Sequence, residues 1–510
     1  MTKQKFFLQG LLLTGVSLFL RVTNMGYRSY LSGRLGPAGM GLYQLIFSIF
    51  ALTVTLSTSG ISLAVTRMVS AAIASGRPQR IRSVAARCLL FCLTISLSIA
   101  LLLFFLADPA AALFLGEPKA APCLRVLGLG LPFMSLCTCM KGYFLAVDES
   151  LSTAWSDALE QVLTIAATVF FFWHFAPQSM EAACLGAMAA STLGEAASFL
   201  SSWAAFRRSL GRNTPARREK SPGVLQGLAH IALPCTLSSA ARSLLNTGEN
   251  LLIPRELQRY GLPRGEALSQ YGLLQGMAMP MLYFPSSFLS SFASLLIPKV
   301  ARERELSHRK AVAHIAGKAV GWTLLFSYFF AAAFSLSGES WGAVFYGSPS
   351  PGAYVKLLAP LVPLLYLDVV VDSLLKAMDE QFNSMKYNFS DSLIRVLLVL
   401  CLLRFFGMES YVAILFFSTI FNASLSLGRL IRVTSLRLSL LRQVVFPLAA
   451  AWASAAGAHG LLRCVGADAA LPSLLLELAL GGALYLSALW LASPGRGNPL
   501  ARLLPKQRRT

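Results

Sequence analysis

Residues 88–107 read CLLFCLTISLSIALLLFFLA, a run with no charge that begins after Arg87 and ends before Asp108. About 20 apolar residues in a helix are enough to cross the hydrocarbon core of a bilayer. The whole chain resembles this run, because 55% of its 510 residues are hydrophobic and 13% are charged, with a mean hydropathy of +0.61. An ordinary soluble protein has roughly 25% charged residues. The composition nearly excludes a water-soluble enzyme and predicts an all-α integral membrane protein.

Fourteen segments of this kind are predicted, and they make the protein a multi-pass one. They are Phe6–Tyr27, Gly39–Gly60, Cys88–Ala107, Ala121–Ala146, Asp157–Phe175, Glu181–Phe206, Val224–Ile253, Ser269–Pro298, Ala311–Leu336, Ala353–Ala377, Tyr387–Phe406, Tyr411–Arg432, Val444–Leu462 and Leu471–Leu491. The first follows Lys3 and Lys5 as a signal peptide would, but no convincing cleavage site follows it, so we expect a retained helix.

The net charge of +21 is concentrated in alternate loops. Lys and Arg gather in the loops that stay in the cytoplasm. This pattern predicts a cell-membrane protein with both termini cytoplasmic, and no nucleic-acid partner is expected. The basic clusters are Arg77 to Arg87, Arg207 to Lys220, Lys299 to Lys310, Arg429 to Arg442 and Arg496 to Arg509.

Cysteine and histidine offer no metal site or cofactor site. The chain has nine cysteines, mostly inside apolar runs, and five histidines without an HExxH motif. Buried thiols of this kind usually pack as small apolar residues. We therefore expect neither a metal nor another cofactor.

The chain contains an internal duplication. Gly41-Leu42-x-Gln44 recurs as Gly272-Leu273-x-Gln275, a displacement of 231 residues (272 − 41). Transporters are often built from such repeats. At the same displacement lie the following matches: Phe114-x-Gly116-x-Pro118 with Phe345-x-Gly347-x-Pro349, Ala146-x-Asp148-Glu149 with Ala377-x-Asp379-Glu380, and Glu160 with Asp391. The Asp-Glu pairs are expected to cap the helices that follow them.

The displacement spans six predicted helices, so the two copies should have the same topology. We expect an N-lobe at 1–210, a basic cytoplasmic linker at 211–222, a C-lobe at 223–436, and a C-terminal helix pair with a basic tail at 437–510. Two parallel six-helix lobes around a central cavity are typical of carriers that work by alternating access.

Polar side chains form a stripe on the first helix of each predicted lobe. Charges inside membrane helices cost at least about 2.5 kcal/mol each, so they usually face the bundle interior. Arginine is a planar donor suited to phosphate, and amides can bind sugar hydroxyls. The candidate substrate-binding residues are Arg21, Asn24 and Arg28 in the first stripe, Arg242, Asn246, Glu249 and Asn250 in the second, and Gln44 and Gln275 at helix entrances.

Each of these residues also has a purely structural interpretation. Arg28 could extend to the membrane surface, and Arg242 could pair with Glu249. Asp368 and Asp372 lie one helical turn apart and could couple an ion, but Lys376 one turn further suggests an internal ion pair.

The chain resembles the multidrug/oligosaccharidyl-lipid/polysaccharide exporter superfamily, and within it the polysaccharide-flippase branch. The residues that carry the likeness are Leu35 to Gln44, Ser59 to Arg67, Leu251 to Arg255 and Tyr271 to Pro280, with Ile297-Pro-Lys299. The resemblance implies export of a polyprenyl-pyrophosphate-linked saccharide, in sporulation the peptidoglycan precursor of the spore cortex. It implies no enzyme activity, and as partners it implies the substrate, membrane lipids and proteins of cell-envelope synthesis.

The match to the peptidoglycan-precursor flippases of that superfamily is incomplete. These carry cavity arginines in their first, second and eighth helices, and here only Arg21 fits, since Gly41 to Val65 and Tyr271 to Ile297 contain no arginine. A multidrug cation antiporter is the main alternative and would need Glu249 or Asp372 as its carboxylate. A membrane glycosyltransferase would need acids in large outer loops, and a non-transporting scaffold is a further alternative.

Overall fold

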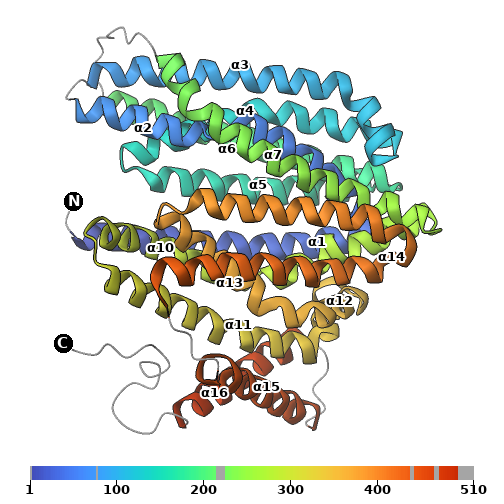
Figure 1. The fold of residues 1–510 in the computed structure, drawn as a ribbon. Coiled ribbons are helices and arrows are strands. Elements are labelled where there is room, and N and C mark those ends of the chain that lie inside the picture. Colours follow the sequence, from blue (N-terminus) through green and yellow to red (C-terminus); the bar gives the residue numbers. More distant parts are fainter. Residues whose placement is uncertain (1–2, 76–77, 214–223, 437–440, 465–469, 492–510) are drawn as a thin grey trace. The chain divides into compact units, whose positions relative to one another are not determined.

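The computed structural model describes residues 3–75, 78–213, 224–436, 441–464 and 470–491, and every regular element in these ranges is a helix (Figure 1). Arg77, Arg437, most of the predicted linker (214–222) and the tail from 492 lie outside the described residues. The chain forms two compact units, one of residues 1–27 and 34–255 and the other of residues 28–33 and 256–510. The predicted boundary between lobes at 211–222 therefore differs from the boundary between compact units, and the lobe division stays a prediction.

The first unit contains most of seven α-helices. They are α1 (Lys3–Thr58), α2 (Ile61–Ala74), α3 (Pro78–Ala110, extended by the π-helical η1, Ala111–Leu115), α4 (Ala121–Ala146, after the 3₁₀ turn η2, Pro118–Ala120), α5 (Ser150–Phe175), α6 (Met180–Asn213) and α7 (Val224–Arg259), which leaves the unit after Arg255. A core of small and aromatic side chains joins α2, α3, α4, α6 and α7, with Val65, Cys88, Met140, Tyr143 and Leu228 almost fully buried.

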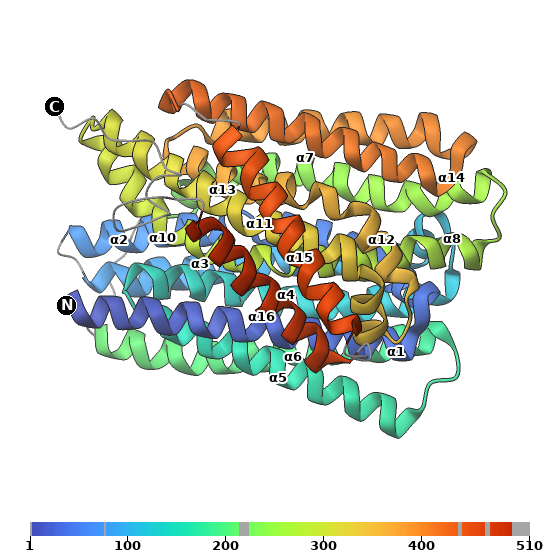
Figure 2. The same ribbon diagram turned by 90° about the horizontal axis from the view of Figure 1, so that it is seen from below.

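The second unit contains the remaining helices. They are α8 (Arg264–Tyr271), the π-helical η3 (Gly272–Ala278), α9 (Met279–Tyr283), α10 (Ser286–Glu305), α11 (Arg309–Tyr346), α12 (Ser350–Leu358), the 3₁₀ turn η4 (Ala359–Leu361), α13 (Val362–Ala377), α14 (Gln381–Thr434), η5 (Leu441–Val445), α15 (Phe446–Cys464) and α16 (Leu471–Leu491). Figure 2 shows α15 and α16 side by side, and both contact α11.

The run 88–107 lies in α3 with much of its surface exposed. Leu102 and Phe105 are 59% and 73% exposed, as expected of side chains that face lipid. The polar groups of the run are satisfied within the helix, since the Thr94 hydroxyl donates to the Leu90 carbonyl at 2.8 Å and the Ser98 hydroxyl to the Thr94 carbonyl at 2.9 Å. A helix with this surface suits a hydrocarbon environment.

Ten stretches of the described chain are long and apolar enough to cross a membrane, or eleven if one bent helix pair counts as a span. Two of them, Gly15–Ala74 and Gln381–Thr434, have 60 and 54 residues, far more than one span requires. Gly36 in α1 and Gly407 in α14 have non-helical backbone angles that divide these helices into separate arms. The all-helical membrane fold is confirmed, and the number fourteen stays a prediction.

Helix boundaries repeat at the displacement found in the sequence. The same displacement relates the ends of α4 and α13, at Ala146 and Ala377, and the starts of α5 and α14, at Ser150 and Gln381. The second copy has one further break, between α12 and α13. The repeated boundaries support an internal duplication.

Backbone angles repeat in the same register. Positive φ values occur at Gly116 and Gly347 (62° and 67°) and at Asp148 and Asp379 (59° and 54°). Few residues other than glycine adopt positive φ values. Their recurrence at equivalent turns is therefore strong evidence that the two copies are alike in backbone conformation there. The capping prediction for the Asp-Glu pairs is wrong, because Glu149 and Glu380 lie at N-cap positions but make no capping hydrogen bond.

Glu380 binds across helices instead of capping its own. Its carboxylate accepts hydrogen bonds from Arg429, at 2.8 and 3.0 Å, and from the Asn383 amide at 2.6 Å. Burial alone would raise the pKa of Glu380, but the hydrogen bonds from Asn383 and Arg429 outweigh it and lower the pKa. The carboxylate therefore joins the two ends of α14.

Candidate functional site

The polar stripe of α1 is only partly buried. Arg21 and Asn24 are exposed, whereas Tyr27 on the same arm is buried, with its hydroxyl 3.0 Å from the Thr168 hydroxyl of α5. Arg28 is half-buried and belongs to the second unit, where the Ser29 hydroxyl donates to the Phe345 carbonyl at the end of α11. The predicted stripe is therefore divided between the two units.

The second stripe lies on α7 and belongs to the first unit. Arg242 is exposed, Asn246 and Asn250 are half-buried, and Glu249 is 5% exposed. The Thr247 hydroxyl fixes this part of α7 to the second arm of α1 by donating to the Ser48 carbonyl at 2.9 Å. Among the described residues, neither Arg21 nor Arg242 forms an ion pair, so the suggested Arg242–Glu249 pair is not formed and both guanidinium groups can receive a ligand.

The two glutamines of the repeated Gly-Leu-x-Gln motif have different surroundings. Gln44 is half-buried in the regular helix α1, whereas Gln275 lies in the π-helical η3 and donates from Nε2 to the Tyr411 hydroxyl at 2.7 Å. A π-helical turn shifts the direction of side chains relative to an α-helix. The sequence repeat therefore does not produce the same side-chain geometry at these two positions.

Asp368 and Asp372 belong to a polar network in the second unit. Asp372 forms an ion pair with Lys376 at 2.6 Å and accepts a hydrogen bond from the Ser384 hydroxyl. Asp368 accepts a hydrogen bond from Asn422 at 3.0 Å. The network continues through three contacts: Asn422 to Asn388 at 3.4 Å, Ser418 to Asp391 at 2.6 Å and Arg395 to Asp391 at 3.7 Å.

The first unit contains a polar cluster that the sequence interpretation missed. Lys141 of α4 and Asp157 of α5 form an ion pair at 2.6 Å, and Glu160 lies one turn further along α5. Glu195 of α6 is 6% exposed. The signal was present in the sequence, since charges inside apolar segments usually mark functional positions, but only helix packing brings these four side chains together.

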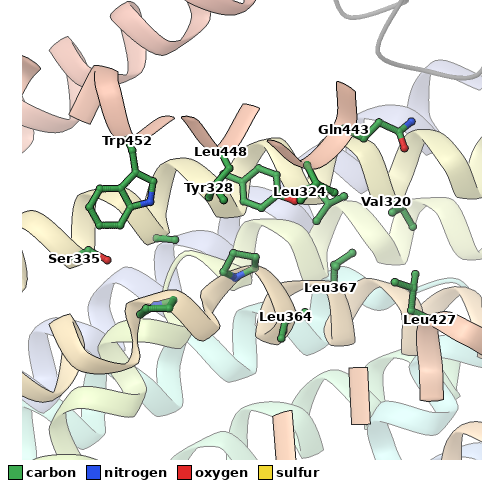
Figure 3. A pocket seen from close by; sticks show the side chains of 14 residues that line it. Val320, Leu324, Tyr328, Ser335, Leu364, Leu367, Leu427, Gln443, Leu448 and Trp452 are labelled. Carbon is green, nitrogen blue, oxygen red and sulfur yellow. The ribbon is translucent and has the colours of Figure 1, made fainter. Parts of the chain in front are cut away.

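An apolar cavity of about 430 Å³ lies in the second unit (Figure 3). Tyr328 and Leu324 of α11, Leu364 of α13 and Trp452 of α15 are among its lining residues, and Gln443 and Ser335 supply the few polar groups. A cavity with this lining is suited to hydrocarbon and unsuited to a sugar or a phosphate.

The chain is similar to polysaccharide biosynthesis proteins and to sporulation proteins. Residues 8–302, more than half of the chain, match the family described as "Polysaccharide biosynthesis protein". The chain is 25% identical to "Stage V sporulation protein B" of Bacillus subtilis (strain 168) over 79% of this chain and 78% of that protein. It is 23% identical to "Sporulation protein YkvU" of the same organism over 69% of this chain and 78% of that protein.

Two solved structures share the fold. The structure "Lipid II flippase MurJ, inward closed conformation" superposes with a TM-score of 0.71 at 12% identity, covering 94% of this chain and 98% of that one. An inward-facing multidrug resistance MATE family transporter of the MOP superfamily superposes with a TM-score of 0.65 at 15% identity, covering 83% and 98%. These likenesses establish a MOP-transporter fold.

Proposed function

The chain belongs to the polysaccharide biosynthesis protein family, and from this premise we propose that it is a flippase for a polyprenyl-pyrophosphate-linked saccharide. Such a protein moves its substrate across the cytoplasmic membrane by alternating access and makes or breaks no covalent bond. The observation that carries the proposal is the exposed pair Arg21 and Arg242. Arg21 lies in α1 and Arg242 in α7, both in the first unit, and neither guanidinium group has a carboxylate partner among the described residues.

The chemistry of the stripes matches that of the substrate in two parts. The guanidinium groups would bind the pyrophosphate through paired hydrogen bonds. The amides Asn24, Asn246 and Asn250 would bind sugar hydroxyls. The polyprenyl chain would stay in the lipid.

The sporulation relatives support a finer proposal, in which the saccharide is a peptidoglycan precursor for the spore cortex. Because two of the three cavity arginines of the peptidoglycan-precursor flippases have no counterpart here, the head group need not be the same. An assay with several polyprenyl-pyrophosphate saccharides that differ only in the sugar would identify it.

A voltage experiment separates the flippase from the cation antiporter. An inside-negative potential favours outward movement of an anion by about 2.3 kcal/mol per charge per 100 mV. In proteoliposomes with a potassium gradient and valinomycin, we expect faster outward flipping of a fluorescent lipid-linked saccharide and no efflux of a cationic dye. Dye efflux that is lost in Asp372→Asn and unaffected by the saccharide would favour the antiporter.

The ion-coupling candidates of the second unit are retained in this proposal. A cation at Asp368 and Asp372 would compete with Lys376 for the Asp372 carboxylate. Flipping that is unchanged by voltage but requires a cation gradient would support coupling at this position.

The direction of export rests on the proposed orientation. Single cysteines in place of Arg212 and Arg304 should be protected from an impermeant thiol reagent in intact cells, and a cysteine in place of Ser350 should react. External labelling at position 212 would reverse the topology and contradict export.

A further inference from the structure

A buried carboxyl group lies where α4, α5 and α6 meet in the first unit. Glu195 is 6% exposed, and its Oε2 has no hydrogen-bond partner among the described residues. A β-carbon at Gly130 would lie 2.6 Å from this oxygen, so the carboxyl group rests against the backbone of α4. In the same way, a β-carbon at the neighbouring Gly194 would lie against the backbone carbonyl oxygen of Glu160 in α5. The two glycines allow the close approach that encloses Glu195.

The charges around Glu195 do not balance. The charged groups that face it from the helices packed against α6 are Glu160 of α5 and Lys141 of α4. Lys141 is already paired with Asp157 at 2.6 Å. Three ionised carboxylates against one ammonium would leave two negative charges, and burying an uncompensated carboxylate is very unfavourable. A bound cation is needed to remove this cost.

A row of buried hydroxyl groups leads from Glu195 toward the end of α6 at Asn213. Ser198 and Ser202 are fully buried, and the Ser198 hydroxyl faces the Glu160 carboxylate. Ser209 is 1% exposed and lies 3.2 Å from the Tyr143 hydroxyl. These serines follow Glu195 by three, seven and fourteen residues, which places all of them on one face of the helix over about 21 Å.

The surroundings favour a proton over a metal ion as the occupant. Within the described part of the chain, no group of three or more His, Cys, Asp or Glu side chains could hold a metal. A single carboxyl group is sufficient for a proton.

We propose that Glu195 and Glu160 form a proton-binding site in the first unit. Glu195 holds the proton as a carboxylic acid, and Glu160 stays ionised beside the Lys141–Asp157 pair. Uptake and release of the proton form and break only the O–H bond of Glu195. The link to transport rests on the proposed flippase function. In that function, the proton is the ion that binds during the transport cycle.

The equivalent position in the second unit provides a contrast. Asp391 matches Glu160 in the repeat, but it accepts a hydrogen bond from Ser418 at 2.6 Å and faces Arg395 at 3.7 Å. Its charge is therefore compensated, and it needs no proton.

Infrared spectroscopy of the full chain in lipid nanodiscs detects the proton directly. We expect a protonated-carboxyl C=O band at neutral pH that is lost in Glu195→Gln and retained in Asp372→Asn, whose carboxylate is paired with Lys376. Glu195→Asp should keep the band at a shifted frequency and serves as the second variant if the glutamine variant does not fold.

A band that persists in Glu195→Gln would overturn the proposal. So would loss of the band on addition of sodium at constant pH, since that result identifies a metal-ion site. The flipping assay is independent: a wild-type protein that moves no lipid-linked saccharide refutes the flippase, whereas the infrared band still decides whether the proton site exists.

Discussion

The two copies of the repeat have the same backbone and opposite polar chemistry. The turns at Asp148 and Asp379 share a positive φ, and the helices that flank them begin and end in register. Yet Lys141 in the first unit corresponds to Asp372 in the second, so a cation stands where the other copy has an anion. The duplication preserves residues that determine the fold, and the residues that determine chemistry have diverged.

The difference is largest in how the charges are compensated. In the second unit, Asp391 and Asp372 each face a basic side chain and a serine hydroxyl. In the first unit, Glu195 is buried with an oxygen that has no partner among the described residues. Compensated charges hold helices together, whereas the uncompensated carboxyl group of Glu195 is the one that we propose holds a proton.

The largest effect is expected when Asp391 is compared with Glu160, the residue at the equivalent position of the other copy. Asp391→Asn should lower the free energy of unfolding by about 3 kcal/mol, because it removes a buried negative charge that faces the half-buried Arg395. Glu160→Gln should cost less than about 1 kcal/mol, because it removes excess negative charge. Denaturant titration in detergent micelles measures both. Equal losses would mean that the two positions are electrostatically alike.

A smaller effect is expected at the ends of α14, where the first unit has Ser198 in place of Arg429. Glu380 has a lowered pKa, so its stabilisation is present above the ordinary carboxyl pKa and is lost as the pH falls through the lowered value. At neutral pH, Arg429→Met should cost about 2 kcal/mol, and in acid below that lowered pKa the cost should vanish. The unfolding titration repeated at acidic pH checks this, and a cost independent of pH would show that packing, and not charge, is responsible.

The last effect on stability concerns a backbone position that differs between the copies. Ala176 and Gly407 both have positive φ, 37° and 63°, but their ψ angles are 62° and −153°. Gly407→Ala should destabilise by about 1–3 kcal/mol, because residues other than glycine rarely adopt its conformation, and by more if the Tyr260 ring, which the new β-carbon would meet, does not move. Ala176→Gly should be neutral or stabilising. Thermal unfolding measures both, and a stabilising Gly407→Ala would contradict the backbone angles given for this turn.

The sequence allowed the repeated framework to be predicted because glycine and turn residues act locally. Phe114-x-Gly116 and Phe345-x-Gly347 predicted equivalent turns, and the backbone angles agree. The pairing of Lys141 with Asp157 could not be read from the sequence, because it depends on how two helices pack. The π-helical surroundings of Gln275 and the assignment of Arg28 to the second unit depend on packing in the same way.

The most direct measurement is flipping of a fluorescent polyprenyl-pyrophosphate saccharide by the wild type, by the Arg21→Ala/Arg242→Ala double variant and by Arg125→Ala. Arg125 provides a matched control because it pairs with Asp108 at 2.5 Å, away from both stripes. Each charged hydrogen bond to phosphate is worth about 1.5–3 kcal/mol, so the double variant should flip at least about 100-fold more slowly. Arg→Lys at both positions should restore only part of the rate, since an ammonium cannot reproduce the planar fork. Wild-type flipping by a fully inserted double alanine variant would contradict the assignment of Arg21 and Arg242 to the pyrophosphate.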